Sequence, residues 1–79
     1  MKTTVRITVI IPDNYGRIQR LYDDGMYFSL QEEVITGADK LADFIEELKA
    51  RGGREIDKHE FIDDDDFKQK TCVRYELIC

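Results

Sequence analysis

Residues 36–53, with the sequence TGADKLADFIEELKARGG, constrain the fold most, because they show the pattern of one amphipathic helix with its own start and stop. Thr36 and Asp39 make a variant of the capping box, in which the hydroxyl accepts a hydrogen bond from an otherwise unpaired amide. Gly52 and Gly53 are typical of a helix end, where a residue tolerant of positive φ is favoured. Apolar residues recur between these ends at steps of three and four: Ala38, Leu41, Ala42, Phe44, Ile45 and Leu48. One face of this helix is therefore expected to be buried.

Strand patterns come before the helix. Residues 3–11 alternate in period two and are rich in β-branched side chains, which predicts a half-buried strand. Residues 17–22 and 26–31 flank an Asp24-Gly25 pair, and this arrangement predicts a hairpin. Between these strands, the chain is expected to reverse at a turn cluster of Pro12, Asp13, Asn14 and Gly16.

The remaining segments complete the predicted sheet. Met26, Phe28 and Leu30 share one face of the third strand, and we expect that face to be buried. Residues 32–35 are predicted to cross over to the helix, and residues 54–62 to form a short edge strand or an ordered loop. Residues 71–78 alternate again and are predicted to be the closing strand.

The predicted fold class is α+β in a single compact domain spanning residues 1–79. A small, mostly antiparallel sheet of four to five strands would carry one helix on one face, in the order β-β-β-α-(β)-β. A chain of 79 residues buries only about 60% of the surface that it exposes when unfolded, so its stability is expected to be modest.

Charge limits the classes of partner. The formal net charge of -5 argues against general affinity for nucleic acids or anionic membranes, because both need clustered cations. An acidic chain of this kind is expected to meet a basic protein surface. The first apolar run is interrupted by Arg6 and ended by Pro12, too short for a secretory signal, so we expect a cytoplasmic protein with reduced thiols at Cys72 and Cys79.

Four consecutive aspartates, Asp63, Asp64, Asp65 and Asp66, are the most unusual local feature. Calcium binding is one interpretation, but an EF-hand loop counted from Asp63 would place Lys68 and Arg74 where its Gly and Glu are required. A solvated turn is the simpler interpretation. A third interpretation is an acidic surface that imitates a phosphate backbone, to which Glu60 and Asp57 would contribute.

The sheet face away from the helix suggests a different partner. Arg6, Tyr27 and Arg74, with Arg20 and Tyr22, are expected to project from it. Aromatic side chains interleaved with Arg are what a base-stacking platform requires, although such residues more often form a solvated face or a dimer interface.

Catalysis is not expected. His59 is the only histidine and lies between Lys58 and Glu60, in a setting typical of an exposed residue. The chain contains no Gly-rich phosphate loop, and neither cysteine has the surroundings of an activated nucleophile. We therefore expect no cofactor and no metal.

At the level of type, the chain resembles the small acidic inhibitor proteins encoded by phages and mobile elements, including those of the anti-CRISPR type. The resemblance is carried by the short chain, the single helix TGADKLADFIEELKARGG and the acidic run Asp63 to Asp66. It implies a protein that occupies the surface of a larger, often nucleic-acid-binding complex and uses charge complementarity for rapid encounter.

The expected function is that of a non-catalytic acidic binding protein that blocks or modulates a larger protein complex by covering its basic nucleic-acid-binding surface. Its expected contact residues are Asp57, Glu60 and Asp63 to Asp66. Two alternatives stay open: a module that binds single-stranded nucleic acid through Arg6, Tyr27 and Arg74, and a structural homo-oligomeric subunit, such as a homodimer, that uses the open face or edge strands.

Overall fold

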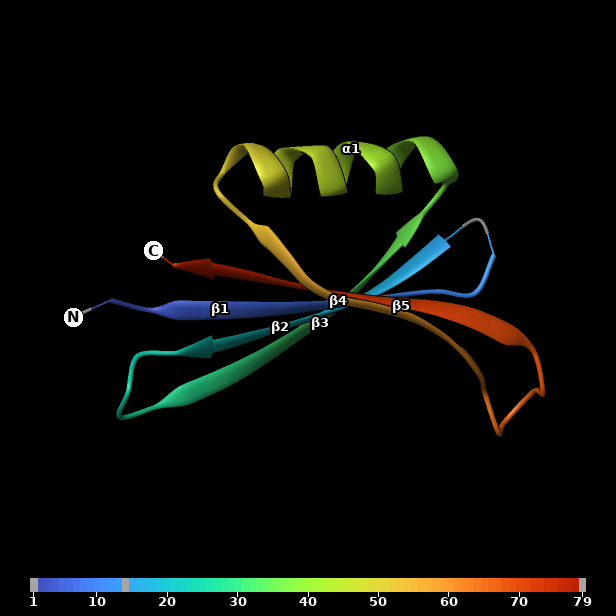
Figure 1. Ribbon diagram of the computed structural model, residues 1–79, viewed down its shortest axis with the longest axis horizontal. Helices are drawn as coiled ribbons and strands as arrows, with labels where there is room; N and C mark the ends of the chain where they lie inside the picture. The colour runs from blue at the N-terminus through green and yellow to red at the C-terminus, as the bar shows by residue number, and fades with distance from the viewer. Residues whose placement is uncertain (1, 14, 79) are drawn as a thin grey trace.

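The computed structural model describes residues 2–13 and 15–78, and these form a five-stranded antiparallel sheet with one helix (Figure 1). The elements are β1 (Thr4–Ile11), β2 (Tyr15–Asp23), β3 (Phe28–Thr36), α1 (Ala38–Ala50), β4 (Arg54–Ile62) and β5 (Gln69–Ile78). The α+β class and the element order are therefore confirmed. Residues 54–62, predicted as a strand or a loop, are a strand.

The strands lie in the order β3-β2-β1-β5-β4, and each neighbouring pair is antiparallel. It follows that β3 and β4 run in the same direction at opposite edges of the sheet. Helix α1 connects them by crossing one face, as Figure 1 shows. We name the covered side the helix face and the other side the open face.

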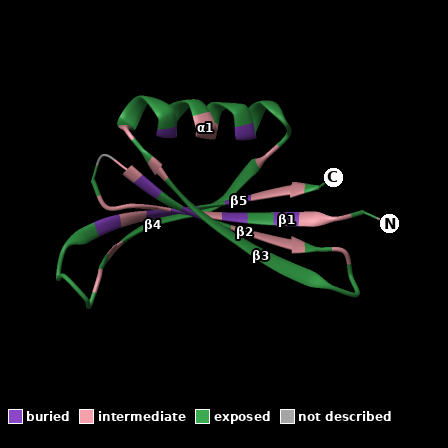
Figure 2. Cartoon of the chain, turned by 180° about the vertical axis from the view of Figure 1, so that it is seen from behind, coloured by how far each residue is buried: buried purple, intermediate pink, exposed green. Residues whose placement is uncertain are grey.

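The core lies between α1 and the three central strands. Val5, Ile7 and Val9 of β1 are buried on the helix face, as the alternation of residues 3–11 predicted. The other buried core residues are Ile18, Leu41, Leu48, Val73 and Tyr75. Figure 2 shows that the buried positions of the helix lie on the side that faces the sheet. Of the six residues in the predicted helix stripe, Leu41 and Leu48 are buried, Phe44 and Ile45 are half-buried, and Ala38 and Ala42 are exposed.

The sequence predicted the end of the helix correctly but not its start. The predicted cap at Thr36 is wrong, since the N-cap is Gly37 and no side chain caps it. Thr36 is still paired with Tyr15 in the sheet, and Gly37, with φ of 105°, makes the turn from strand to helix. The predicted stop is confirmed. Gly52 N–H donates to Lys49 O and Gly53 N–H donates to Leu48 O, which is a Schellman motif.

Strand β3 is longer than predicted and faces the other way. It continues through residues 32–35, which were expected to be a crossover. Phe28 and Leu30 pair with Asp23 and Leu21 on the open face, so the prediction that they are buried is wrong. Phe28 is 78% exposed and Leu30 is 55% exposed, and Met26, in the turn before the strand, is exposed as well. The reason is that β3 lies at the edge of the sheet, where only Ile35 reaches the core.

The remaining sequence predictions concern the turns between strands. The Asp24-Gly25 hairpin is confirmed: Asp24 N–H donates to Tyr27 O, and Gly25 has φ of 95°. Asp24 Oδ1 also accepts from the N–H groups of Met26 and Tyr27, and these bonds hold the pKa of the Asp24 carboxyl below its usual range. Gly16, predicted to be part of the first turn, lies in β2, where Leu41 packs against it. Asn14 and Cys79 lie outside the described residues.

Candidate binding surfaces

The aspartate run forms the turn between β4 and β5. Phe67 N–H donates to Asp63 O at 2.8 Å, and Asp63 N–H donates to Lys68 O at 3.0 Å. Two of the four carboxylates also accept backbone hydrogen bonds: Asp63 Oδ1 from Asp65 N–H and Asp66 Oδ1 from Lys68 N–H. Carboxylates that bond to nearby amides in this way stabilise a turn. Asp63 and Asp66 therefore stabilise the turn in which they lie.

Lys70 pairs with the same two carboxylates. Its Nζ lies 2.5 Å from Asp63 Oδ2 and 3.1 Å from Asp66 Oδ2, and the residue is only 8% exposed. The Lys70 bond holds the pKa of Asp63 below its usual range, and Asp63 in turn raises the pKa of Lys70. For Asp66, the N–H of Lys68 lowers the pKa most, followed by Lys70. Asp64 and Asp65 project into solvent, and within the described residues their carboxylates have no hydrogen bond or ion pair, whereas Asp66 is paired but keeps 41% of its side chain exposed.

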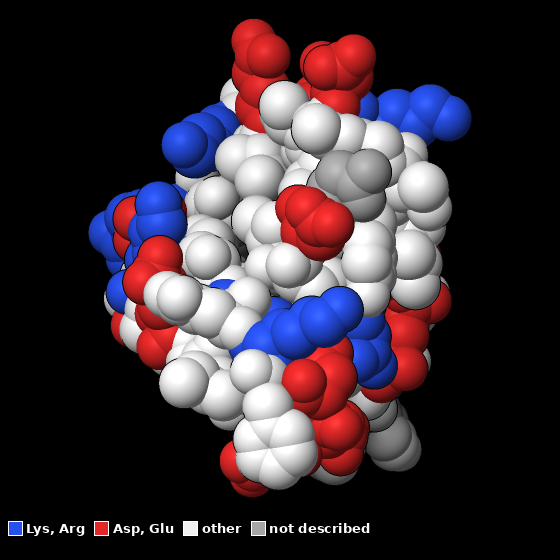
Figure 3. Space-filling model, turned by 90° about the vertical axis from the view of Figure 1, so that its right-hand side faces the viewer, with Lys and Arg blue, Asp and Glu red and all other residues white. Residues whose placement is uncertain are grey.

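Asp57 and Glu60 were predicted to form one acidic surface with the aspartate run, but they lie on opposite faces of the sheet. Asp57 is paired in register with Arg74 and lies on the open face, whereas Glu60 is paired with Thr71 on the helix face. Each carboxylate also has a neighbour of its own: His59 Nδ1 lies 3.0 Å from Asp57 Oδ2, and Gln69 Nε2 donates to Glu60 Oε2 at 2.6 Å. On the side of the molecule with the β4–β5 turn, Figure 3 shows acidic and basic side chains interspersed.

The calcium interpretation of the aspartate run gains no support. Lys70 Nζ lies between two of the four carboxylates, at the place where a cation would have to bind. In the part of the chain that the structure describes, no three His, Cys, Asp or Glu side chains are placed to hold one metal ion. Cys72 is a buried free thiol.

The open face brings together two of the three residues predicted for it. Arg6 of β1 and Arg74 of β5 line a groove of about 270 Å³ together with the apolar side chains of Leu21, Leu30 and Ile56. We name this the open-face groove. Tyr27 is not part of it, since it lies exposed in the β2–β3 turn. Its absence removes the aromatic side chain from the predicted base-stacking platform.

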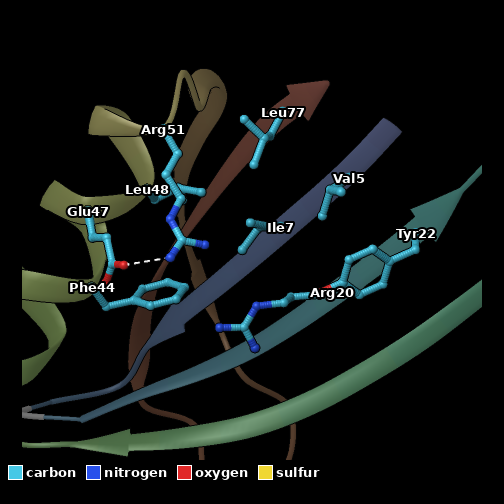
Figure 4. Close-up of a pocket in the computed structure, with 9 residues that line it drawn as sticks. All are labelled: Val5, Ile7, Arg20, Tyr22, Phe44, Glu47, Leu48, Arg51 and Leu77. Carbon is cyan, nitrogen blue, oxygen red and sulfur yellow. Dashed lines mark hydrogen bonds and ion pairs between the residues drawn. The ribbon is translucent and has the colours of Figure 1, made fainter. Parts of the chain in front are cut away.

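The prediction that Arg20 and Tyr22 project from the open face is wrong. Tyr22 is paired with Val5 and Arg20 with Ile7, so both lie on the helix face. They line a cavity of about 300 Å³ between α1 and the sheet, together with Phe44, Leu48 and Arg51 (Figure 4). The Arg20 guanidinium lies 5.1 Å from the centre of the Phe44 ring and forms an ion pair with Glu33.

This cavity contains no unpaired charge. Arg51 pairs with Glu47 at 2.8 Å, as the dashed line in Figure 4 marks, and Arg20 is already neutralised by Glu33. Its other walls are apolar side chains of β1, α1 and β5. The cavity therefore continues the core, and the charged residues that line it, Arg20, Glu47 and Arg51, are each ion-paired.

Acidic and basic side chains are mixed on the open face. Arg6 forms an ion pair with Glu76 at 3.7 Å, Gln19 donates a hydrogen bond to Glu32 at 3.1 Å, and His59 lies against Asp57. By contrast, Arg74 and Arg17 have no ion pair among the described residues, and their registers with Thr8 and Ile10 place both on this face. The open face therefore presents two arginines that are available to a partner.

Sequence reasoning missed the apolar part of this surface. Leu21, Leu30 and Ile56 line the groove, and half-buried Ile10 also lies on the open face. One signal was present in the sequence: Ile10 shares its face of the first strand with Thr4, Arg6 and Thr8, in a series that is otherwise polar. An apolar residue at a position expected to face water indicates a second contact surface.

No family model, no curated protein and no solved structure matches this chain. Among the described residues, no helix has both the length and the apolar character needed to span a lipid bilayer.

Proposed function

We propose that this chain is a non-catalytic binding module that modulates a larger protein complex by docking its open-face groove on an extended segment of a protein partner. The partner segment carries carboxylates beside an apolar side chain. The observation that supports this most is the placement of Arg6 and Arg74, on two neighbouring inner strands, in a groove that Leu21, Leu30 and Ile56 also line.

The groove has the composition of an interaction hot spot. Arg is enriched at such sites, and an apolar floor supplies affinity where it is desolvated by the partner. The two guanidinium groups favour approach of an acidic segment and fix its position, because charge complementarity acts mainly on the association rate and on specificity. A partner with alternating carboxylate and apolar side chains is complementary in both respects.

Single-stranded nucleic acid is the less favoured occupant of the same groove. Phosphates complement Arg6 and Arg74, but stacking needs an aromatic platform, and none of the residues that line the groove is Phe or Trp. Tyr75 contributes to the lining, but its side chain is buried on the opposite face, where burial raises the pKa of its hydroxyl. The nucleic-acid alternative is therefore one outcome of the test below.

The acidic turn supports a second proposal of the same class. Asp64 and Asp65 are exposed and lie at the tip of the β4–β5 hairpin, where they are able to contact a basic protein surface. This is the docking mode expected of an anti-CRISPR-type inhibitor. It rests mainly on these two carboxylates, because Asp63 and Asp66 share the single positive charge of Lys70.

The test compares three probes on isotope-labelled protein by NMR titration. The probes are a short peptide of alternating Glu and Leu, a short oligo-Lys peptide, and an oligothymidylate. We expect the Glu-Leu peptide to shift the amide signals of Leu21, Leu30 and Arg74. Replacing Arg6 and Arg74 together with Ala should weaken its binding about tenfold or more, as loss of a hot spot does.

The matched control is the double variant Asp64→Asn and Asp65→Asn, which leaves the groove intact and should bind the Glu-Leu peptide as the wild type does. Binding of the oligo-Lys peptide that this variant abolishes would favour the acidic turn as the docking site. The groove proposal fails if the arginine variant keeps full affinity for the Glu-Leu peptide, or if the oligothymidylate alone shifts the groove signals.

A further inference from the structure

The two edge strands of the sheet differ in how well they are protected from pairing with another chain. Strand β4 has a bulge between Glu55 and Asp57, and its neighbouring side chains alternate in charge. Bulges and charged side chains, especially Lys, are the usual devices that keep an edge strand from pairing. Lys58 stands near the middle of β4. The β4 edge is therefore protected from pairing with a strand of another chain.

Strand β3 has no bulge and no Lys, and its charged residues are Glu32 and Glu33. Its register with β2 runs without interruption from Phe28 to Thr36, and its sequence contains no Lys, Arg, Pro or Gly. Its two carboxylates are occupied by β2, because Gln19 donates to Glu32 and Arg20 pairs with Glu33. Figure 2 shows the strand exposed over nearly its whole length, and only Ile35 is half-buried. The edge of β3 is thus long, regular and open.

The side chains of β3 complement those of a second copy. If two β3 strands pair antiparallel about a two-fold axis at Glu32, Leu30 of each copy lies opposite Val34 of the other on the open face. Leu30 is 55% exposed and Val34 is 61% exposed in the single chain, so both gain burial. On the helix face, the same register places Gln31 opposite Glu33, a pair able to hydrogen-bond. The one unfavourable contact is Glu32 with its own copy.

The exposed area of the chain fits a missing contact. The chain exposes 5840 Å², whereas a compact monomer of this mass exposes about 5,000 Å². The difference, roughly 800 Å², equals the area of about 800 Å² that one partner contributes to a standard interface.

We propose that two copies of this chain associate through antiparallel pairing of their β3 strands, with the two-fold axis at Glu32, to form one continuous ten-stranded sheet. Both helices then lie on one side, and both open-face grooves lie on the other. The proposal goes beyond the binding function. Leu30 belongs both to the groove and to the paired strand, whereas Arg6 and Arg74 lie on β1 and β5, away from the β3 edge, and stay accessible in each copy. The pairing gives the dimer two grooves on one surface, so a partner with two suitable segments would bind with avidity.

Sedimentation equilibrium measures the association directly. We expect the wild type to change from one chain to two as its concentration rises. Val34→Lys should raise the dimer dissociation constant about tenfold, because it removes two symmetric cross-strand pairs. Glu32→Gln should lower the constant, because it removes the like charges at the axis. Ile62→Lys, a matched substitution on exposed β4, should leave it unchanged.

Disulfide trapping tests the register and stays informative if one of these variants folds poorly. In a Cys79→Ser background, Glu32→Cys should form a covalent dimer under mild oxidation, whereas Gln31→Cys and Glu33→Cys should not. A single-chain mass at every concentration overturns the proposal. So does a dimer that Ile62→Lys disrupts and Val34→Lys does not, or a covalent dimer formed through position 31 or 33. The arginine variants of the groove leave β3 unchanged, so failure of the groove and failure of the dimer are separate results.

Discussion

At the scale of single residues, Gly53 after the helix lies so close to the backbone of Leu48 that a larger side chain does not fit. A Cβ built on Gly53 would lie 2.7 Å from Leu48 O and 2.9 Å from Leu48 Cγ. The same residue donates its N–H to that carbonyl to close the Schellman motif. Its small size is therefore needed for the connection from α1 to β4.

We predict that Gly53→Ala lowers the free energy of unfolding by about 1–3 kcal/mol, because the added methyl group collides with backbone that cannot move without breaking the motif. Urea denaturation followed by circular dichroism measures the loss. Gly25→Ala is the control, since a Cβ there meets nothing within 4 Å and adds only the strain of a positive φ. If both variants lose the same free energy of unfolding, the predicted collision with Leu48 does not destabilise Gly53→Ala.

Also at the residue scale, the Lys70 cluster predicts how stability depends on pH. The folded-state pKa values of Asp63 and Asp66 are lowered, so their contribution is present above the unfolded pKa of about 3.9 and is lost as the pH falls through the folded values. The pKa of Lys70 is raised, so its contribution is complete below the unfolded value and is lost as the pH rises through the folded one.

We predict that Lys70→Met lowers the midpoint of thermal unfolding at neutral pH and that the difference from the wild type shrinks in strong acid. Circular dichroism melting curves at neutral and acidic pH measure both effects. Lys40→Met is the control, because Lys40 is exposed on α1 and has no ion pair among the described residues. A difference from the wild type that stays constant from neutral to acid would contradict the assigned role of the cluster.

At the scale of elements, α1 is held to the sheet by few side chains. Leu41 and Leu48 are its buried residues, and both belong to the core cluster with β1, β2 and β5. The helix has a favourable ion pair between Glu47 and Arg51, but exposed pairs contribute little. Burial of these two leucines is therefore the main interaction that keeps the helix in place.

We predict that Leu48→Ala costs about 2–5 kcal/mol of folding free energy, a large share of the stability of a domain this small. Phe28→Ala is the matched comparison. The sequence pattern predicted that Phe28 is buried, but the structure leaves it 78% exposed, so its loss should change stability by no more than about 0.5 kcal/mol. Chemical denaturation of both variants decides the matter, and a loss for Phe28→Ala similar to that for Leu48→Ala would mean that β3 faces inward.

At the scale of the whole molecule, the strand order predicts where the fold is most stable. Strand β1 lies at the centre of the sheet with a neighbour on each side, whereas β3 and β4 have one neighbour each. Regions with few buried contacts open more readily than the centre of a sheet.

We predict that amide hydrogen exchange is slowest in β1 and β5 and faster in both edge strands. The exchange of β3 should slow when protein concentration rises, because the proposed dimer protects its edge, whereas the exchange of β4 should not change. Exchange measured by NMR at two concentrations gives both values. Protection of β4 instead of β3 would place the association at the other edge.

The sequence by itself determined the features that depend on neighbouring residues. These are the alternation that buries Val5, Ile7 and Val9, the apolar stripe that buries Leu41 and Leu48, and the hairpin signal at Asp24 and Gly25. The glycine stop of the helix belongs to the same group. Each arises from local geometry, in which spacing along the chain fixes position in space, and together they were sufficient for the α+β class and the order of its elements.

Only the tertiary structure decided which strands lie at the edges and which residues face each other across them. It turned Phe28 and Leu30 toward the open face, brought Arg6 to Arg74, and paired Lys70 with two carboxylates of the aspartate run. The physical reason is that these placements follow from pairing between distant segments. The alternation of a strand shows which side chains share a face, but only the neighbours of the strand determine which face is covered.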